Sequence, residues 1–214
     1  PFEKFGTALI PNKLFQIEVA SSRMEQYDSK SRKPSEVKYA NLKEDLKRRD
    51  FTINAMAMDI HPEKFGELLD PLGGVADLGK EILKTPMDPD KTFSDDPLRM
   101  MRAAYFASKL NFKIESKCRS SMVKQSIRIK IVSWERVRDE FIKILMTVRP
   151  SVGLTILQKT GLMKIVFPEI DIMYDMKQSP DWHHKDIFAH TLHVVDNASK
   201  LTEKMEIRFA ALVH

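Results

Sequence analysis

The feature that most constrains the fold is a nearly unbroken run of helical patterns from Ser94 onward. Apolar residues recur at helical spacing in this part of the chain, and the alternation typical of strands is scarce. Only 7 glycines, beside 11 prolines and 12 methionines, also favour helices over a glycine-rich barrel or sandwich. We predict helices over six segments: 97–110, 116–125, 133–146, 150–160, 186–201 and 203–214.

The chain before Pro89 has a different character, with β-prone segments and short helices. Two apolar runs, 5–10 and 14–20, flank the turn signal Pro11-Asn12-Lys13 and predict a β-hairpin. The polar, basic stretch 29–35 predicts a loop. We therefore expect an α+β fold, in which a small α/β part precedes a helical array.

Three further elements are predicted in this first part. Asn41 followed by Glu44 is typical of a capping box and indicates the start of a helix. A second helix is expected from about Thr52 to Met58, and a short strand over 66–70 leads into a turn at 71–74.

Composition excludes several classes of protein. Hydrophobic residues make up 43% of the 214 residues and charged residues 30%, which supports a packed core and argues against disorder. The single cysteine, Cys118, excludes an intramolecular disulfide framework and a multi-cysteine zinc ribbon. No apolar run approaches the roughly 18 residues of a membrane span, and no signal-peptide pattern is present, so we expect a cytoplasmic protein without a membrane partner. The formal charge of +5 permits a polyanionic partner without requiring one.

Both ends of the sequence predict a piece of a longer protein. The chain begins at Pro1 in a strand-like segment and ends at His214 after an apolar helical run without a cap.

The densest polar cluster is the segment 48–55, at a predicted junction between helices. The guanidinium forks of Arg48 and Arg49 suit phosphate oxygens, Asp50 can accept from a ribose hydroxyl, and Asn54 can do either. The alternative is a solvated helix end at which Asp50 caps the next helix.

A second cluster, at the start of the helix predicted from Pro97, holds Asp95, Asp96 and Arg99. Spacings of three and four residues place these side chains on one helical face. An acceptor beside a donor matches the Watson–Crick edge of C or A, whereas G and U present the reverse polarity. The alternative is a capped helix with a local ion pair.

Five segments, taken in order, resemble the class II CCA-adding tRNA nucleotidyltransferases and the related bacterial poly(A) polymerases, within the DNA polymerase β-like superfamily. They read FGTA, IEVA, RRDFTINA, DPLGGVADL and DDPLRMMRA, and begin at residues 5, 17, 48, 70 and 95. The resemblance implies part of a nucleotidyltransferase head over 1–88, a helical neck that recognises the base over 89–150, and a helical body over 151–214.

The resemblance also implies roles for matched residues. The ribose- and triphosphate-binding motif falls on Arg48, Arg49, Asp50 and Asn54, and Arg23 is a further candidate for phosphate contact. Asp95, Asp96 and Arg99 fall on the protein template that selects CTP and then ATP; the family usually has Glu at the first position. Asp70, Gly73 and Gly74 fall on the hinge between head and neck.

The metal sites implied by the resemblance are incomplete in this sequence. The family's Asp-x-Asp pair for two Mg²⁺ ions precedes the FGTA strand, and without it in-line attack lacks its metal clamp, so we expect the chain by itself to be inactive. Glu18 matches a strand position where a third catalytic carboxylate can stand, although a buried Glu18 paired with Arg23 is an equal alternative. His190 and His214 resemble the first ligands of a divalent metal in an HD domain, a metal-dependent phosphohydrolase fold.

The resemblance thus implies an enzyme that transfers CMP and AMP from CTP and ATP to the 3′ end of tRNA. Three alternatives are left open: poly(A) addition to RNA, phosphohydrolysis by the HD-like region as the main activity, and a non-catalytic module that binds RNA or nucleotide.

Overall fold

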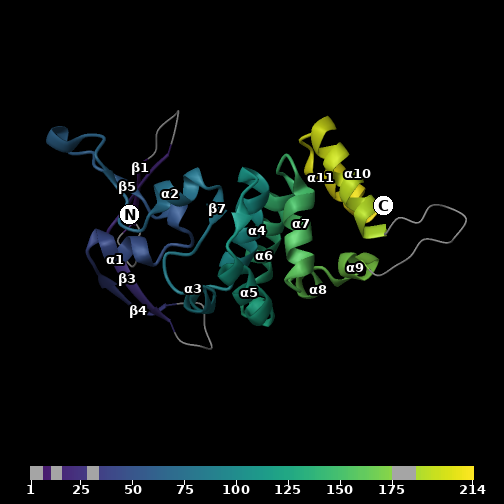
Figure 1. The fold of residues 1–214 in the computed structure, drawn as a ribbon, viewed down its shortest axis with the longest axis horizontal. Coiled ribbons are helices and arrows are strands. Elements are labelled where there is room, and N and C mark those ends of the chain that lie inside the picture. Colours follow the sequence, from purple (N-terminus) through teal and green to yellow (C-terminus); the bar gives the residue numbers. More distant parts are fainter. Residues whose placement is uncertain (1–6, 11–15, 28–33, 175–186) are drawn as a thin grey trace, which may run out of the picture.

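The computed structural model describes residues 7–10, 16–27, 34–174 and 187–214. They form an elongated α+β arrangement, with short strand pairs toward one end and helices along the rest of its length (Figure 1). The helices in the described part of the chain do not reach the length and apolarity that a transmembrane segment requires.

The described strands form four separate two-stranded sheets. The predicted first hairpin is confirmed, since Thr7 faces Ala20 across an antiparallel pair, although its turn lies outside the described residues. The pairs are β1 (Thr7–Ile10) with β2 (Ile17–Ala20), β3 (Arg23–Tyr27) with β4 (Pro34–Tyr39), β5 (Ala57–Met58) with β6 (Leu68–Leu69), and β7 (Ile82–Leu83) with β8 (Lys113–Ile114). Only the last pair is parallel.

The six helices predicted from Pro97 onward are all present, with ends shifted by two residues or fewer. They are α4 (Leu98–Leu110), α5 (Ser116–Gln125), α6 (Trp134–Leu145), α7 (Pro150–Lys159), α10 (Ile187–Leu201) and α11 (Met205–Val213). Shorter helices are α1 (Leu42–Lys47), α2 (Gly74–Gly79), α3 (Pro89–Asp95), α8 (Met163–Val166) and α9 (Pro168–Asp171). The predicted cap of the first helix is confirmed, because Asn41 Oδ1 accepts the Glu44 N–H at 2.9 Å.

One prediction in the first part of the chain is wrong, and a second is wrong at its last two residues. The predicted helix from Thr52 to Met58 is a single 3₁₀ turn, η2 (Thr52–Asn54), followed by strand β5. The Thr52 N–H donates to the Lys84 carbonyl, and β5 pairs with β6, so nonlocal backbone bonds replace helical ones. The predicted loop 29–35 overlaps β4 at Pro34 and Ser35, of which Pro34 pairs with Tyr27 of β3; residues 28–33 lie outside the described residues.

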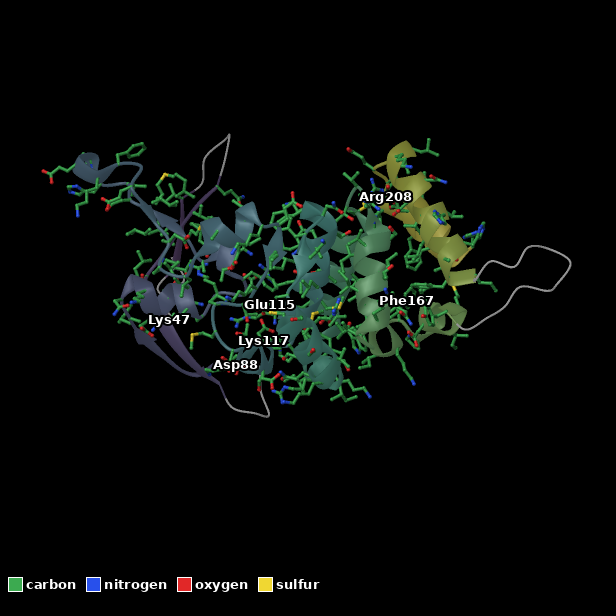
Figure 2. The ribbon with its side chains drawn as sticks, viewed as in Figure 1. Lys47, Asp88, Glu115, Lys117, Phe167 and Arg208 are labelled. Carbon is green, nitrogen blue, oxygen red and sulfur yellow. The ribbon has the colours of Figure 1, made fainter. Side chains whose placement is uncertain are left out.

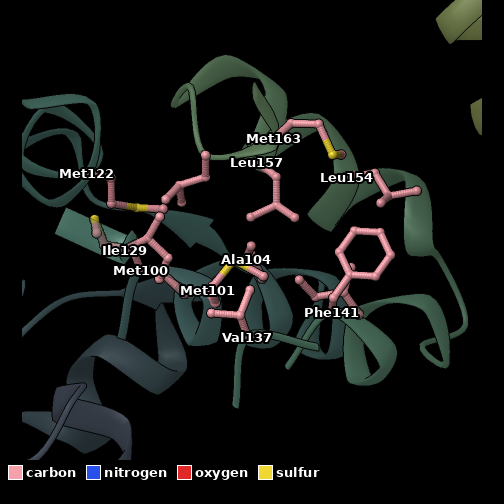
Figure 3. Packing of buried hydrophobic residues seen from close by; sticks show 14 of the residues in the cluster. Met100, Met101, Ala104, Met122, Ile129, Val137, Phe141, Leu154, Leu157 and Met163 are labelled. Atoms are coloured by element: carbon pink, nitrogen blue, oxygen red, sulfur yellow. The ribbon is translucent and has the colours of Figure 1, made fainter. Parts of the chain in front are cut away.

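The hydrophobic core is continuous from Phe51 to Leu212 and centres on α4. Met100, Met101 and Ala104 of α4 are fully buried, and the helices packed on α4 contribute Val137 of α6 and Leu157 of α7 to the same cluster (Figure 3). Methionine side chains suit this setting because their flexible thioethers fill irregular gaps between helices. The core therefore holds the neighbouring helices of the array in fixed positions around α4.

A buried arginine joins the last helices to the centre. Arg208 of α11, labelled in Figure 2, is 4% exposed. Its guanidinium donates to four main-chain carbonyls, those of Leu145 (3.1 Å), Thr147 (2.8 Å), Ser199 (3.0 Å) and Thr202 (2.8 Å). These carbonyls lie at the ends of α6 and α10, so a single side chain connects three helices.

Gly153 lies where α7 packs closely against α4 and α6. A methyl group at this position would lie 2.6 Å from Ile144 Cγ2 and 3.1 Å from the Ala104 carbonyl oxygen.

We predict that Gly153→Ala lowers the free energy of unfolding by about 1–3 kcal/mol, because packed helices must move apart. Gly79→Ala is the matched control, since nothing lies within 4 Å of its Cβ. Urea unfolding should show a gain of up to about 1 kcal/mol in Gly79→Ala, from helix propensity. Equal stability of the two variants would contradict the packing described.

Candidate functional site

A polar cavity of about 470 Å³ lies where the turn after α1, the start of α4 and one face of α6 meet. Its lining holds six cationic and four acidic side chains. The residues are Arg48, Arg49, Asp50, Asn54, Asp96, Leu98, Arg99, Arg102, Arg136, Asp139, Glu140 and Lys143. The cavity therefore gathers both polar clusters that the sequence singled out, with a third set from α6.

One buried carboxylate orients two arginines of the cavity. Asp45 of α1 is 4% exposed. Its Oδ1 accepts from Arg48 Nε and Nη2 at 3.0 and 2.7 Å, and its Oδ2 accepts from Arg49 Nη2 at 2.9 Å. Such paired N–H donors restrict the plane of a guanidinium. Arg48 and Arg49 are thus presented side by side in defined orientations.

Asp50 connects the turn after α1 to helix α4. Its Oδ1 accepts from the Phe51 N–H at 2.9 Å and from Asn54 Nδ2 at 3.1 Å, and its Oδ2 accepts from Arg102 Nε at 2.7 Å. Arg102 Nη2 also lies 2.7 Å from Oδ2, which makes a forked ion pair. The alternative role of Asp50 as a helix cap is wrong, because Phe51 is the N-cap residue of η2 and has no side-chain cap.

Asp96 and Arg99 line the cavity without pairing with each other. Asp96 Oδ1 accepts the Leu98 N–H at 3.2 Å, and its Oδ2 lies 3.1 Å from Arg136 Nη2. Arg99 donates to the carbonyls of Thr92, at 3.3 Å, and Arg48. A carboxylate offers about four lone-pair sites and a guanidinium five N–H groups, so both side chains keep hydrogen-bonding capacity.

The expectation that Asp95 shares a helical face with Arg99 is wrong. Asp95 is the last residue of α3, and α4 begins only at Leu98, so no helix runs from Asp95 to Arg99. The Asp95 carboxylate instead lies 3.2 Å from Lys91 Nζ on its own helix, and it does not line the cavity.

Two buried polar atoms of the lining have no hydrogen-bond partner among the described residues. These are Arg136 Nη1, a donor, and Glu140 Oε2, an acceptor; Glu140 is 4% exposed. Buried polar groups are almost always hydrogen-bonded, so these two atoms are open to water or to a polar ligand that enters the cavity. Glu140 Oε1 is held by Lys143 Nζ at 2.7 Å.

Sequence reasoning did not select Arg102, Arg136, Glu140 or Lys143 for this site. Arg102 carried a local signal, because it follows Arg99 by three residues and therefore lies on the same face of α4. The three residues of α6 had no such signal, since only packing of α6 against α4 brings them to the cavity.

The predicted hinge residues form the cap of α2. Asp70 Oδ1 accepts the Gly74 N–H at 2.7 Å, and its Oδ2 accepts the Val75 N–H at 2.9 Å. Gly73 has φ +76°, which favours glycine, and a Cβ at Gly74 would lie 2.9 Å from Met56 Cγ. The segment is thus a tightly built turn beside η2.

The remaining predicted residues lie away from the cavity. Glu18 is exposed on β2 and stands opposite Leu9, which removes the alternative of a buried Glu18; Arg23 begins β3. His190 of α10 and His214, which follows α11, have ring centroids 5.6 Å apart. Within the described ranges, no three His, Cys, Asp or Glu side chains are grouped to hold a metal ion, so neither metal site is complete there.

Burial raises the pKa of the Cys118 thiol to about 11, which makes it unreactive.

Two parts of the chain match families of known proteins. Residues 1–84 match the family described as "Poly A polymerase head domain", and residues 111–173 match "Probable RNA and SrmB-binding site of polymerase A". The chain is 41% identical over 179 residues to the multifunctional CCA protein of Vibrio parahaemolyticus. That alignment covers 81% of this chain and 42% of the relative.

The chain belongs to the CCA-adding and poly(A) polymerase family.

Solved structures of this family have the same fold. The CCA-adding enzyme of Bacillus stearothermophilus, in complex with CTP, matches with a TM-score of 0.65 and 34% identity, over 74% of this chain and 37% of that one. A tRNA nucleotidyltransferase complexed with a primer tRNA and an incoming ATP analogue matches with a TM-score of 0.68 and 26% identity, over 99% of this chain and 63% of that one.

The cavity lies at the junction of the two family matches. Arg48 to Asn54 fall within the head match, and Arg136 to Lys143 fall within the second match. Asp96, Arg99 and Arg102 come from the segment between them. In this member of the CCA-adding and poly(A) polymerase family, the site is therefore assembled from both parts of the chain.

The cap of α2 predicts a pH dependence of stability. Desolvation opposes ionisation of Asp70, but backbone N–H groups, foremost those of Val75 and Gly74, hold its pKa below the ordinary value of 3.8. Because the folded pKa is the lower one, the stabilisation is present above the unfolded value and is lost as pH falls through the folded value. In urea unfolding at pH 6 and pH 3, Asp70→Asn should lose less stability on acidification than the wild type, by roughly 0.3–1 kcal/mol. Identical losses would show that the Asp70 charge does not stabilise the cap.

Proposed function

We propose that this chain is part of a template-independent RNA nucleotidyltransferase that adds CMP and AMP, from CTP and ATP, to the 3′ end of tRNA. The observation that carries the proposal is the single cavity in which the arginines of the 48–54 turn meet Asp96 and Arg99. The chain spans about 42% of the length of the curated relative from Vibrio parahaemolyticus, which is named as a multifunctional CCA protein.

The arginines of the turn supply contacts for the triphosphate. Arg48 and Arg49 are already oriented by Asp45, so little side-chain entropy is lost when they meet phosphate oxygens. Asn54, fixed by Asp50, is placed to contact the ribose. Arg102 supports this group through Asp50, and Arg23 is a further phosphate contact in the proposal.

Asp96 and Arg99 select the base. Asp96 accepts from the exocyclic amine of C or A, and an Arg99 N–H donates to the ring nitrogen beside it. G and U present a donor where Arg99 donates and an acceptor where Asp96 accepts, so both would leave unpaired groups in the cavity. Asp95 has no part in this proposal, because it pairs with Lys91 and lies outside the cavity.

Other parts of the proposal rest on the family. Enzymes of this kind depend on divalent metal ions, and we propose Mg²⁺ here, with Glu18 as an accessory carboxylate. The described residues do not assemble its site, so no catalytic step is assigned to it. The division into head (1–88), neck (89–150) and body (151–214), with a hinge at Asp70, Gly73 and Gly74, and a cytoplasmic location belong to the same proposal.

The HD-like region is not advanced as a second function. Its two histidines lie within reach of one ion, but the described residues add no third ligand. His190 and His214 are proposed only as partial ligands of a divalent metal.

Binding of the four nucleoside triphosphates to the 214-residue chain tests the base-selection proposal. By titration calorimetry, CTP and ATP should bind roughly 10- to 100-fold more tightly than GTP and UTP, as expected for one or two mismatched hydrogen bonds. Arg99→Ala should reduce this preference to a few-fold while circular dichroism shows an intact fold. Lys164→Ala, an exposed lysine of α8 outside the cavity, is the matched control and should keep the full preference.

Two results would contradict the proposal. One is equal affinity of the wild type for all four nucleotides, and the other is an unchanged preference in Arg99→Ala. Preference for ATP alone, without CTP, would instead favour poly(A) addition.

A further inference from the structure

Asp50, in the polar cavity, has all of its hydrogen-bonding capacity in use. A carboxylate offers about four acceptor sites. The Phe51 N–H and Asn54 Nδ2 meet Oδ1, and two guanidinium nitrogens of Arg102, Nε and Nη2, meet Oδ2. Asp50 therefore accepts from a further donor, such as the hydroxyl of a ribose, only if one of these four contacts is given up.

Arg102 is the donor to Asp50 that has a second carboxylate beside it. Its Nη1 lies 3.9 Å from Glu140 Oε1, and its side chain is 34% exposed, so the guanidinium has room to tilt. The Phe106 ring, with its centroid 5.2 Å from Arg102 Cζ, attracts the guanidinium in either position. The Phe51 N–H, by contrast, belongs to a fully buried residue and would lose its partner inside the protein.

Glu140 has an open acceptor for a second cation. Its side chain is buried, and its Oε1 is held by Lys143 Nζ at 2.7 Å. Its Oε2 is also buried and has no hydrogen-bond partner in the part of the chain that the structure describes. A buried acceptor without a donor costs free energy, which an N–H of a guanidinium recovers. Glu140 thus offers Arg102 an acceptor with the same charge as Asp50.

We infer that Glu140 is a positioning residue that draws part of the Arg102 guanidinium away from Asp50 when a nucleotide binds. Nη2 leaves Asp50 Oδ2, a ribose hydroxyl of the nucleotide donates there instead, and Nη1 closes on the Glu140 carboxylate. Nε stays with Asp50, so Arg102 bridges the two acids and neither carboxylate is left without its cation. The inference rests on the proposed function, because it takes the ligand of the cavity to be a ribonucleotide.

This exchange makes recognition of the ribose depend on α6. Asp50 lies within the head match and Glu140 within the second family match, while Arg102 comes from the segment between them. A ligand shifts an equilibrium only through contacts that differ between the two states. A nucleotide that carries the hydroxyl therefore shifts Arg102 toward α6, whereas one that lacks it leaves Arg102 on Asp50.

Titration calorimetry with CTP, 2′-deoxy-CTP and 3′-deoxy-CTP tests this assignment. The wild type should bind CTP roughly 10-fold more tightly than the analogue that lacks the hydroxyl accepted by Asp50, as expected for one charge-assisted hydrogen bond. Glu140→Gln keeps the size of the side chain and an oxygen for Lys143, but it attracts a guanidinium less. It should reduce the preference to about 2- to 3-fold, and its affinity for the analogue should not fall. Glu135→Gln, at an exposed position of α6 outside the cavity, is the matched control and should keep the full preference.

The Arg102 side chain gives a second measurement that needs no Glu140 variant. Heteronuclear NMR detects the Nε–H group of an arginine held in an ion pair, and loss of one signal in Arg102→Lys assigns it. This signal should shift when CTP is added to the wild type and shift much less with the deoxy analogue. An equal shift with both nucleotides would overturn the inference, even if Glu140→Gln failed to fold.

The outcomes separate this inference from the proposed function. If the wild type prefers CTP and ATP over GTP and UTP but Glu140→Gln keeps the ribose preference, another donor leaves Asp50; the inference is then overturned and the proposed function stands. Equal affinity of the wild type for CTP and both deoxy analogues would also overturn it, without affecting base selection. If the wild type binds none of the nucleoside triphosphates, both fail.

Discussion

The forked ion pair between Asp50 and Arg102 is the contact on which the site depends. It joins the turn after α1 to the middle of α4, two segments that the chain order separates by about fifty residues. Asp50 is 7% exposed, and removal of one member of a buried pair leaves the other charge without compensation. Arg102 also lies 5.2 Å from the centroid of the Phe106 ring, so its position is set by packing as well as charge. This ion pair therefore fixes the turn of residues 48–54 relative to Asp96 and Arg99 at the start of α4.

Carboxylates in the cavity wall and just behind it hold most of the cavity's cations in fixed orientations. Asp45 holds Arg48 and Arg49, Asp50 holds Arg102, and Asp96 holds Arg136. Even with Asp45, which lies behind the lining, five acids face six cations, so the site keeps a positive balance that suits a triphosphate. Arginines fixed in this way need little rearrangement when a ligand arrives, and this preorganisation distinguishes the cavity from an ordinary basic surface.

The parts of the structure that local chemistry determines were predictable from sequence. The helices after Pro97 follow from apolar periodicity, and α1 follows from the Asn41 cap. Residues 48–54 and Asp96 with Arg99 were chosen for the functional groups they carry, but their meeting depends on nonlocal packing. Asp95 was misplaced because a break between two helices at 96–97 is not visible in spacing alone. The parallel pair β7–β8 has two residues in each strand, too few for a pattern, and the contribution of α6 to the site required the tertiary structure. The roles of Glu18, Arg23, His190 and His214 stay predictions.

The buried position of Arg208 has a consequence for helix electrostatics. The carbonyl-rich C-terminal ends of α6 and α10 both point their partial negative charge at this guanidinium. A permanent cation at the meeting point of two helix dipoles compensates both, and no carboxylate in the described residues shares it. Since the cation belongs to α11, that helix is an electrostatic cap for the two others. The position of the loop between α6 and α7 therefore depends on Arg208, which stands only six positions before His214.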